Sequence, residues 1–190
     1  MKTLEQSLTQ YAACHRDRRN IATHFAGIPM IVFAVILALA TATITVGPMA
    51  VTMAAIVSIV ACVYYFLLDR VFGVTMAVVL FAMCAAASEI TARMATGATL
   101  GIAGLVFAAG WALQFLGHKF EGMKPAFYDD LMQLAIGPLF VCAEAFFLLG
   151  AKPQLRRYIE DRVGRRDLHG RLGAAIPRPQ VRGHEAGLLR

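Results

Sequence analysis

Three histidines lie where apolar segments of the 190-residue chain begin or end, and their side chains are suited to binding a metal ion. His15 and His24 precede the first long apolar segment, and His118 follows the fourth. Neutral imidazole is the commonest nitrogen ligand for iron, zinc and copper in proteins. A three-histidine metal site is therefore one prediction. The alternative stays open, because a histidine at the end of an apolar segment is more often an ordinary surface residue than a ligand.

The chain that positions these histidines is strongly apolar. Hydrophobic residues make up 58% of it and charged residues 16%, with a mean hydropathy of +0.63, which is unlike a soluble domain. Each apolar segment holds roughly 17 to 20 residues, enough for a helix to cross a hydrocarbon layer of about 30 Å. Helices are expected because lipid offers no partners for backbone amides. The prediction is an all-α, polytopic membrane bundle with apolar segments at 29–46, 51–68, 71–88, 98–115 and 131–149.

Basic residues collect at both ends of the chain, which favours a cytoplasmic location for both termini. Five crossings would separate the termini, so we expect four spans and a fifth segment, residues 131–149, that is re-entrant or interfacial. Residues 1–150 are predicted to form a membrane-embedded catalytic domain, and residues 151–190 a basic, partly disordered tail. The membrane is expected to be a bacterial inner membrane, with the active site on the cytoplasmic side.

A break in the helix is needed before His15 and His24 can bind one ion. On an uninterrupted helix, residues nine positions apart are rotated by about 900° and lie on opposite faces. Asn20 is a favoured N-cap residue. We therefore expect one helix to end near Arg18 and the next to start after Asn20. Pro29 is expected in the first turn of a new span, because it lacks the amide hydrogen that has no partner there.

The residues around His118 add further candidates. Glu121 follows His118 by three positions, so the two side chains share a face if the segment is helical. Glu121 is then a candidate fourth ligand, or a group that orients an imidazole. Its alternative is a charge solvated at the membrane surface beside Lys119 or Lys124. Trp111 is expected to be an interfacial anchor.

Two motifs in separate parts of the chain fix many positions. The first, H-x4-N-x3-H-x2-G-I-P, spans residues 15–29, and the second, W-x2-Q-F-x-G-H-x2-E-x3-P-A, spans residues 111–126. Together with Tyr11, Phe140 and Glu144, they resemble the membrane 2-hydroxy fatty acid dioxygenases, which are named for the metabolism of phytosphingosine to odd-numbered fatty acids. The resemblance covers approximately residues 6–150.

The resemblance implies a non-haem Fe(II) enzyme that performs α-oxidation of a 2-hydroxy fatty acid. The reaction, R-CH(OH)-COOH + O2 → R-COOH + CO2 + H2O, balances without an external reductant, and the chain has no glycine-rich nucleotide motif. Carried over position by position, the expected iron ligands are His15, His24 and His118. The same comparison marks four candidates for orienting a ligand or the substrate: Asn20, Gln114, Glu121 and Glu144.

The expected partners are the 2-hydroxy fatty acid, O2 and membrane lipid, and the oligomeric state stays open. Burial of an acyl chain contributes roughly 0.8 kcal/mol per methylene, so such a substrate already lies in the bilayer. Lys119, Lys124 and Arg19 are candidates for neutralising the substrate carboxylate, although cations here are also typical of positive-inside anchoring. No nucleic-acid partner is expected, because the basic residues lack interleaved aromatic residues.

Two other classes of function compete with the dioxygenase. A small-molecule membrane transporter would place Asp69, Glu89 and Glu144 on a conduction path, and it predicts two similar halves, which the chain does not show. A bis-histidine haem membrane protein would need histidines at matching depths on opposed spans, whereas three histidines here are expected at one membrane boundary.

Overall fold

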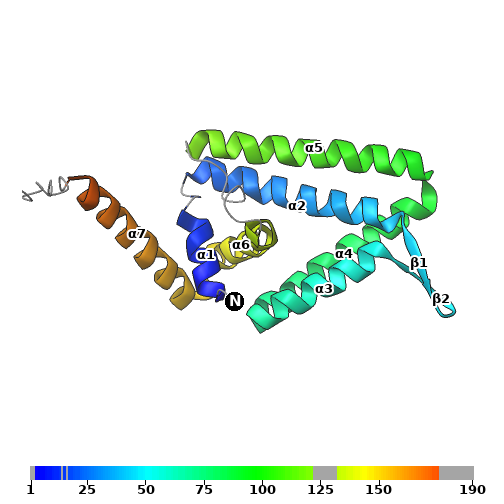
Figure 1. Ribbon diagram of the computed structural model, residues 1–190, viewed down its shortest axis with the longest axis horizontal. Helices are drawn as coiled ribbons and strands as arrows, with labels where there is room; N and C mark the ends of the chain where they lie inside the picture. Colours follow the sequence, from blue (N-terminus) through cyan, green and yellow to red (C-terminus); the bar gives the residue numbers. More distant parts are fainter. Residues whose placement is uncertain (1–2, 14, 16, 122–131, 176–190) are drawn as a thin grey trace, which may run out of the picture.

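The computed structural model describes residues 3–175 apart from Cys14, Arg16 and residues 122–131. In this part of the chain, seven α-helices are accompanied by one antiparallel hairpin of two strands (Figure 1). The elements in chain order are α1 (Leu4–Ala13), α2 (Arg18–Ala40), β1 (Thr43–Val46), β2 (Met49–Thr52), α3 (Met53–Leu68), α4 (Arg70–Arg93), α5 (Thr96–Glu121), α6 (Met132–Leu148) and α7 (Pro153–Ala175).

The apolar helices confirm the all-α, polytopic membrane class. Within the described residues, α2, α4 and α5 are each long and apolar enough to cross a membrane, and α3 is a shorter apolar helix of 16 residues. The fifth apolar segment forms α6, which meets α7 at an angle of 113°. This bend makes the α6–α7 pair a broken span or a re-entrant segment, rather than a fifth straight crossing.

The end of the first apolar segment and the start of the second form a β-hairpin. The expectation that helix covers residues 29–46 is therefore wrong for its last residues. Helix α2 ends at Ala40, and strand β1 pairs with β2 in the register Thr43 to Thr52. The β-branched residues of β1 favour extended backbone. Gly47 adopts a positive φ of 62° at the turn, as a tight hairpin requires.

The predicted break between His15 and His24 exists, but Asn20 is not its cap. Helix α2 begins at Arg18, and its N-cap is Asp17, whose side chain accepts a hydrogen bond from the Arg19 amide at 2.8 Å. Aspartate and asparagine are about equally favoured at this position, so tertiary packing decides between them. Asn20 is instead fully buried inside the first turns of α2.

Pro29 lies inside α2, so the expectation that it starts a new span is wrong. Helix α2 begins 11 residues before Pro29 and continues to Ala40. A proline inside a helix removes one backbone hydrogen bond. The helix nevertheless persists through this position, and the segment that carries His24 is continuous with the membrane span.

Helices α2 and α5 run side by side and in opposite directions, so α2 begins where α5 ends (Figure 1). Glycines make this contact close. A Cβ atom added at Gly27 would lie 2.9 Å from the backbone oxygen of Gly110, and one added at Gly117 would collide with Asn20 and Thr23. Small residues allow such close approach between membrane helices. The approach brings the first turns of α2 beside the last turns of α5.

Helices α3 and α4 form a second antiparallel pair, which diverges from α2 and α5, with α1 and α6 lying in the opening (Figure 1). Two contacts attach α6 and α7 to this pair. The Tyr65 hydroxyl donates a hydrogen bond to the Ala135 carbonyl at 2.9 Å, and Lys152 Nζ lies 2.6 Å from Asp69 Oδ2. Burial of Asp69 opposes its ionisation, but hydrogen bonds from Lys152 and the Phe72 amide hold its pKa below the ordinary value.

Replacement of Gly27 by alanine tests the α2–α5 contact. The added methyl group has no space against the Gly110 backbone, and overpacking of this kind costs about 1 to 3 kcal/mol. The apparent melting temperature in detergent, followed by circular dichroism, should fall by roughly 3 to 10 °C. Gly104→Ala on α5 is the matched control, because nothing lies within 4 Å of its added Cβ. Equal melting temperatures for the two variants would contradict the packing described.

Candidate metal centre

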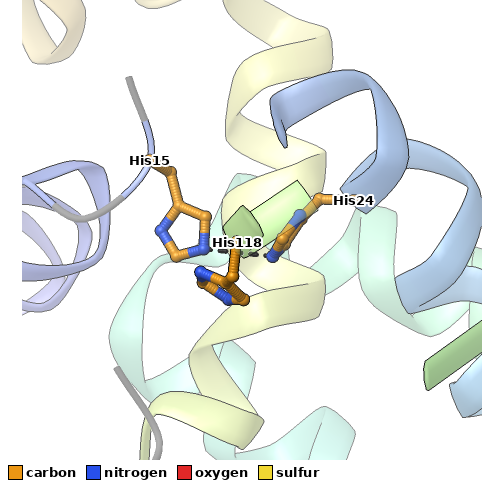
Figure 2. A group of neighbouring side chains, drawn as sticks. All are labelled: His15, His24 and His118. Carbon is orange, nitrogen blue, oxygen red and sulfur yellow. Dashed lines mark hydrogen bonds between the residues drawn. The ribbon is translucent and has the colours of Figure 1, made fainter. Parts of the chain in front are cut away.

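The three histidines meet at the end of the molecule where α2 begins and α5 ends. His15 lies in the connection between α1 and α2, His24 in α2 and His118 near the end of α5. Their exposed fractions are only 3%, 1% and 7%. Figure 2 shows the three rings turned toward one another, with His15 Nε2 and His24 Nε2 3.0 Å apart. One ring nitrogen from each histidine lies within 4.8 Å of the others.

Backbone hydrogen bonds set the orientation of two of these rings. His15 Nδ1 lies 2.7 Å from the Tyr11 carbonyl oxygen, and His24 Nδ1 lies 2.9 Å from the Asn20 carbonyl oxygen. A carbonyl only accepts, so each Nδ1 carries the hydrogen, and in a neutral ring Nε2 then presents a lone pair. Metal-bound histidines commonly donate their second ring nitrogen to a carbonyl in this way.

The pair of facing Nε2 atoms offers a position for a shared cation. Two neutral rings held as described would direct two lone pairs at each other across 3.0 Å. A proton on one ring would relieve this, but burial, the largest effect, lowers the pKa of His15 to about 4. The ring is therefore neutral near pH 7, which is the form that binds metal. A shared metal ion satisfies both lone pairs.

The spacing of the His15 and His24 rings already fits a shared metal ion, and the His118 ring lies close enough to join them after a side-chain movement. At metal–nitrogen distances of about 2.1 Å, two ligands at right angles lie about 3.0 Å apart. The His15–His24 separation already has this value. A pair at the upper limit of 4.8 Å would have to approach by about 1.8 Å to reach the same right-angle spacing. The donor set therefore fits a metal ion.

Aromatic rings from two other helices hold the His15 ring in place. Tyr11 of α1 stacks on it at a centroid distance of 4.1 Å and an interplanar angle of 7°. Phe140 of α6 packs against both rings, at 5.6 Å from His15 and 4.6 Å from Tyr11. Since His15 belongs to no helix, this packing replaces the support that a helix gives to His24 and His118.

A cavity of about 70 Å³ opens beside the histidines and extends along α2 and α5. Its walls are mostly apolar. It is lined by Tyr11, His15, His24, Ile28, Ile31, Val32, Trp111, Gln114, His118, Leu134, Gly137 and Pro138. On α2 and α5 these residues recur at helical spacing from the histidines. The helical spacing of these residues from His24 and His118 is therefore a signal in the sequence that could have predicted the apolar wall.

The chain matches one known protein family over most of its length. Residues 1–149 match the family described as 2-hydroxy-palmitic acid dioxygenase Mpo1-like. The chain belongs to the Mpo1-like family. The resemblance seen in the two sequence motifs is thereby confirmed, and the family description indicates a dioxygenase. No curated protein and no solved structure matches the chain.

Three of the other candidate residues of this Mpo1-like protein have different surroundings. Gln114 lines the cavity beside the histidines. Asn20 supports His24 through its backbone carbonyl, and its side chain faces the position of Gly117. Glu144 lines a second cavity of about 360 Å³, which is bordered by α1, α6 and α7 and is also lined by His15. Glu144 and Gln114 therefore line two different cavities, and His15 lines both of them.

The candidate cations lie away from the cavity. Arg19 is 66% exposed, pairs with Asp17 at 2.9 Å and extends over the Phe120 ring. Lys119 is exposed at the surface of α5. The Glu121 side chain and Lys124 lie outside the described residues. Within the part of the chain that the structure describes, the cavity beside the histidines has no lysine or arginine in its lining.

Metal content tests the triad of this Mpo1-like protein. Purified protein loaded anaerobically with Fe(II) should hold about one ion per chain, and His15→Ala, His24→Ala and His118→Ala should each weaken binding by more than about 100-fold, because removing a ligand costs more than removing its supporting group. Elemental analysis after desalting measures the retained metal. His184→Ala, in the tail beyond the described residues, is the matched control. Full metal retention in the three triad variants would exclude the site.

Proposed function

We propose that this Mpo1-like protein is a non-haem Fe(II) dioxygenase that converts a 2-hydroxy fatty acid into the acid one carbon shorter and CO2. The observation that carries the proposal is the buried group of three histidine nitrogens beside an apolar cavity. The family description supports the same class of reaction. An enzyme that oxidises a membrane lipid at an iron ion would account for the three histidines, the apolar cavity and the membrane helices together.

Three neutral nitrogen ligands suit Fe(II) in an oxygenase. Sites of this class hold the metal on one face and leave its other positions open. Iron bound here would supply the redox chemistry that brings O2 and the substrate together. The chain supplies His15, His24 and His118 as ligands, fixes two of the rings by backbone hydrogen bonds and keeps the site buried. Burial limits the access of bulk water to the reacting groups.

The cavity is sized for the head of a lipid rather than for the whole molecule. Pockets that enclose drug-sized ligands have volumes of about 300 to 1,000 Å³, whereas this cavity measures about 70 Å³. The carboxyl group, the hydroxyl group and the first few carbons of the substrate therefore enter it. Ile28, Ile31 and Val32 give the cavity an apolar wall on α2 for these carbons, and the rest of the acyl chain would stay in the bilayer, where its burial is favourable.

The two alternative functions receive less support from the geometry. Of the acidic residues that a transporter would need, Asp69 caps α4 and pairs with Lys152, and Glu89 pairs with Arg93 at 2.6 Å. These are structural roles. A haem needs its two axial histidines on opposite faces of a broad macrocycle, and a cavity of about 70 Å³ beside three converging rings has no space for one.

The arrangement also supports an active site on the cytoplasmic side of the membrane, which we propose is a bacterial inner membrane. The start of α2 carries Arg18 and Arg19, and the described part of α7 carries Arg156, Arg157 and Arg162. Cationic residues beside spans favour the cytoplasmic side. Because α2 begins where α5 ends, the histidine site lies at the same end of the molecule as the arginines of α2 (Figure 1).

A turnover assay tests the proposed reaction. Protein purified anaerobically with Fe(II) should convert 2-hydroxypalmitate to pentadecanoic acid when O2 is admitted, releasing one CO2 per O2 consumed, without any added reductant. Mass spectrometry of the lipid extract and an oxygen electrode measure the products and the stoichiometry. His118→Ala should lower the rate by more than about 100-fold while the protein remains inserted in the membrane. An unchanged rate in His118→Ala, or a requirement for a reductant, would contradict the proposal.

A further inference from the structure

Besides the histidines, the described lining of the cavity carries three side chains with hydrogen-bonding groups, Tyr11, Trp111 and Gln114, and Gln114 is the carboxamide among them. Gln114 lies on α5, four residues and about 6 Å before His118, so it shares a face of the helix with that ligand. It is 6% exposed, and it lines the cavity together with Ile28, Trp111 and Leu134. A carboxamide in such apolar surroundings calls for a hydrogen-bonding partner.

The amide group of Gln114 lacks that partner within the described residues. Its Nε2 atom is buried and makes no hydrogen bond to the described part of the protein. Burial of an unsatisfied donor is costly, and buried donors are seldom left without an acceptor. The position of Nε2 is also constrained, because a Cβ atom at Gly27 would collide with it. The absence of a side chain at Gly27 therefore leaves space for this carboxamide at the α2–α5 contact.

Among the other donors in the lining are the Tyr11 hydroxyl and the Trp111 indole N–H, and the lining contains no described lysine or arginine. The two described cations considered for this role, Arg19 and Lys119, are exposed and do not line the cavity. The histidines direct ring nitrogens toward one another and toward the metal position. A neutral donor is also the less costly choice in an apolar pocket, because an unpaired buried cation is strongly disfavoured.

We propose that Gln114 Nε2 donates a hydrogen bond to the carboxylate of the bound fatty acid and so positions the acid beside the histidines. The inference rests on the proposed function for the class of ligand. It assigns carboxylate recognition to a neutral amide in the membrane-facing cavity rather than to a surface lysine or arginine. Gln114 is accordingly a residue that selects for acids over alcohols of the same chain length.

The chain provides its own reporter for a binding test. Trp111 is the single tryptophan of the sequence, and it lines the same cavity as Gln114. Its fluorescence can be titrated with 2-hydroxypalmitate and with 1-pentadecanol, which keeps the hydroxyl group and the chain but lacks the carboxylate. Titrations under argon, with Fe(II)-loaded and metal-free protein, measure binding without turnover.

Two variants separate hydrogen bonding from packing. Gln114→Met keeps the length of the side chain but removes the donor, and it should weaken binding of 2-hydroxypalmitate by about tenfold or more, because hydrogen bonds to charged groups are the strong ones. Binding of 1-pentadecanol should change by less than about threefold. Gln114→Glu should weaken the acid further by charge repulsion and leave the alcohol almost unaffected. Gln154→Met, at an exposed position of α7, is the matched control.

Several results would overturn the assignment. One is unchanged binding of the acid in Gln114→Met, and another is an equal loss for acid and alcohol, which marks a packing role. The wild-type protein gives a test that needs no variant: metal-free protein that binds 1-pentadecanol as tightly as 2-hydroxypalmitate excludes a carboxylate contact at Gln114. If the acid-specific losses occur but no shortened acid forms under O2, the binding role of Gln114 stands and the proposed reaction fails.

Discussion

The close approach of α2 and α5 is the constraint on which the histidine site depends. Gly27 and Gly110 allow the two backbones to come together, and Gly117 leaves space for Asn20 and Thr23 near the end of α5. This contact fixes His24 relative to His118, since each histidine is carried on one of the two helices. His15 joins them because the chain breaks between α1 and α2 and because the Tyr11 and Phe140 rings hold its imidazole. The packing of α2 against α5 therefore also determines how His24 and His118 lie relative to each other.

Burial of the three histidines disfavours their protonation and so favours the neutral rings that can bind a metal ion. Carbonyl groups of Tyr11 and Asn20 hold the Nδ1 hydrogens, so that Nε2 of His15 and His24 point into the shared space. Desolvation disfavours an imidazolium ion there, whereas a metal ion compensates its own desolvation through coordination to several ligands. The mostly apolar cavity begins at the same point, and in the proposed reaction it would receive the reacting end of the fatty acid. His15 also lines the second cavity, which contains Glu144 and borders α7.

Composition and the lengths of the apolar segments were enough to predict the membrane helices. The residues alone left an ordinary surface role open for the three histidines, and the resemblance to the family marked them as joint ligands. The exact start of α2 and the position of Pro29 within it depended on tertiary packing, which a single sequence does not reveal. Asp17 caps α2 in place of Asn20, since two good capping residues were available and the burial of Asn20 decided between them. Pro29 was expected to start a helix, but the preceding turns pack against α5 and keep the helix continuous. Gln114 stood out in the sequence only as a motif residue, and its role became arguable once the cavity placed its amide among apolar side chains.

The central claim is that three imidazoles from separate parts of the chain hold one iron ion. X-ray absorption at the iron edge, measured on protein loaded anaerobically with Fe(II), tests it most directly because it counts the nitrogen ligands. We expect three imidazole nitrogens at about 2.1 Å in the wild-type protein, a distance typical of metal–histidine bonds, and two in any histidine variant of the triad that still retains iron. An iron environment without imidazole scattering, or one that is unchanged when His15, His24 or His118 is replaced, would contradict it.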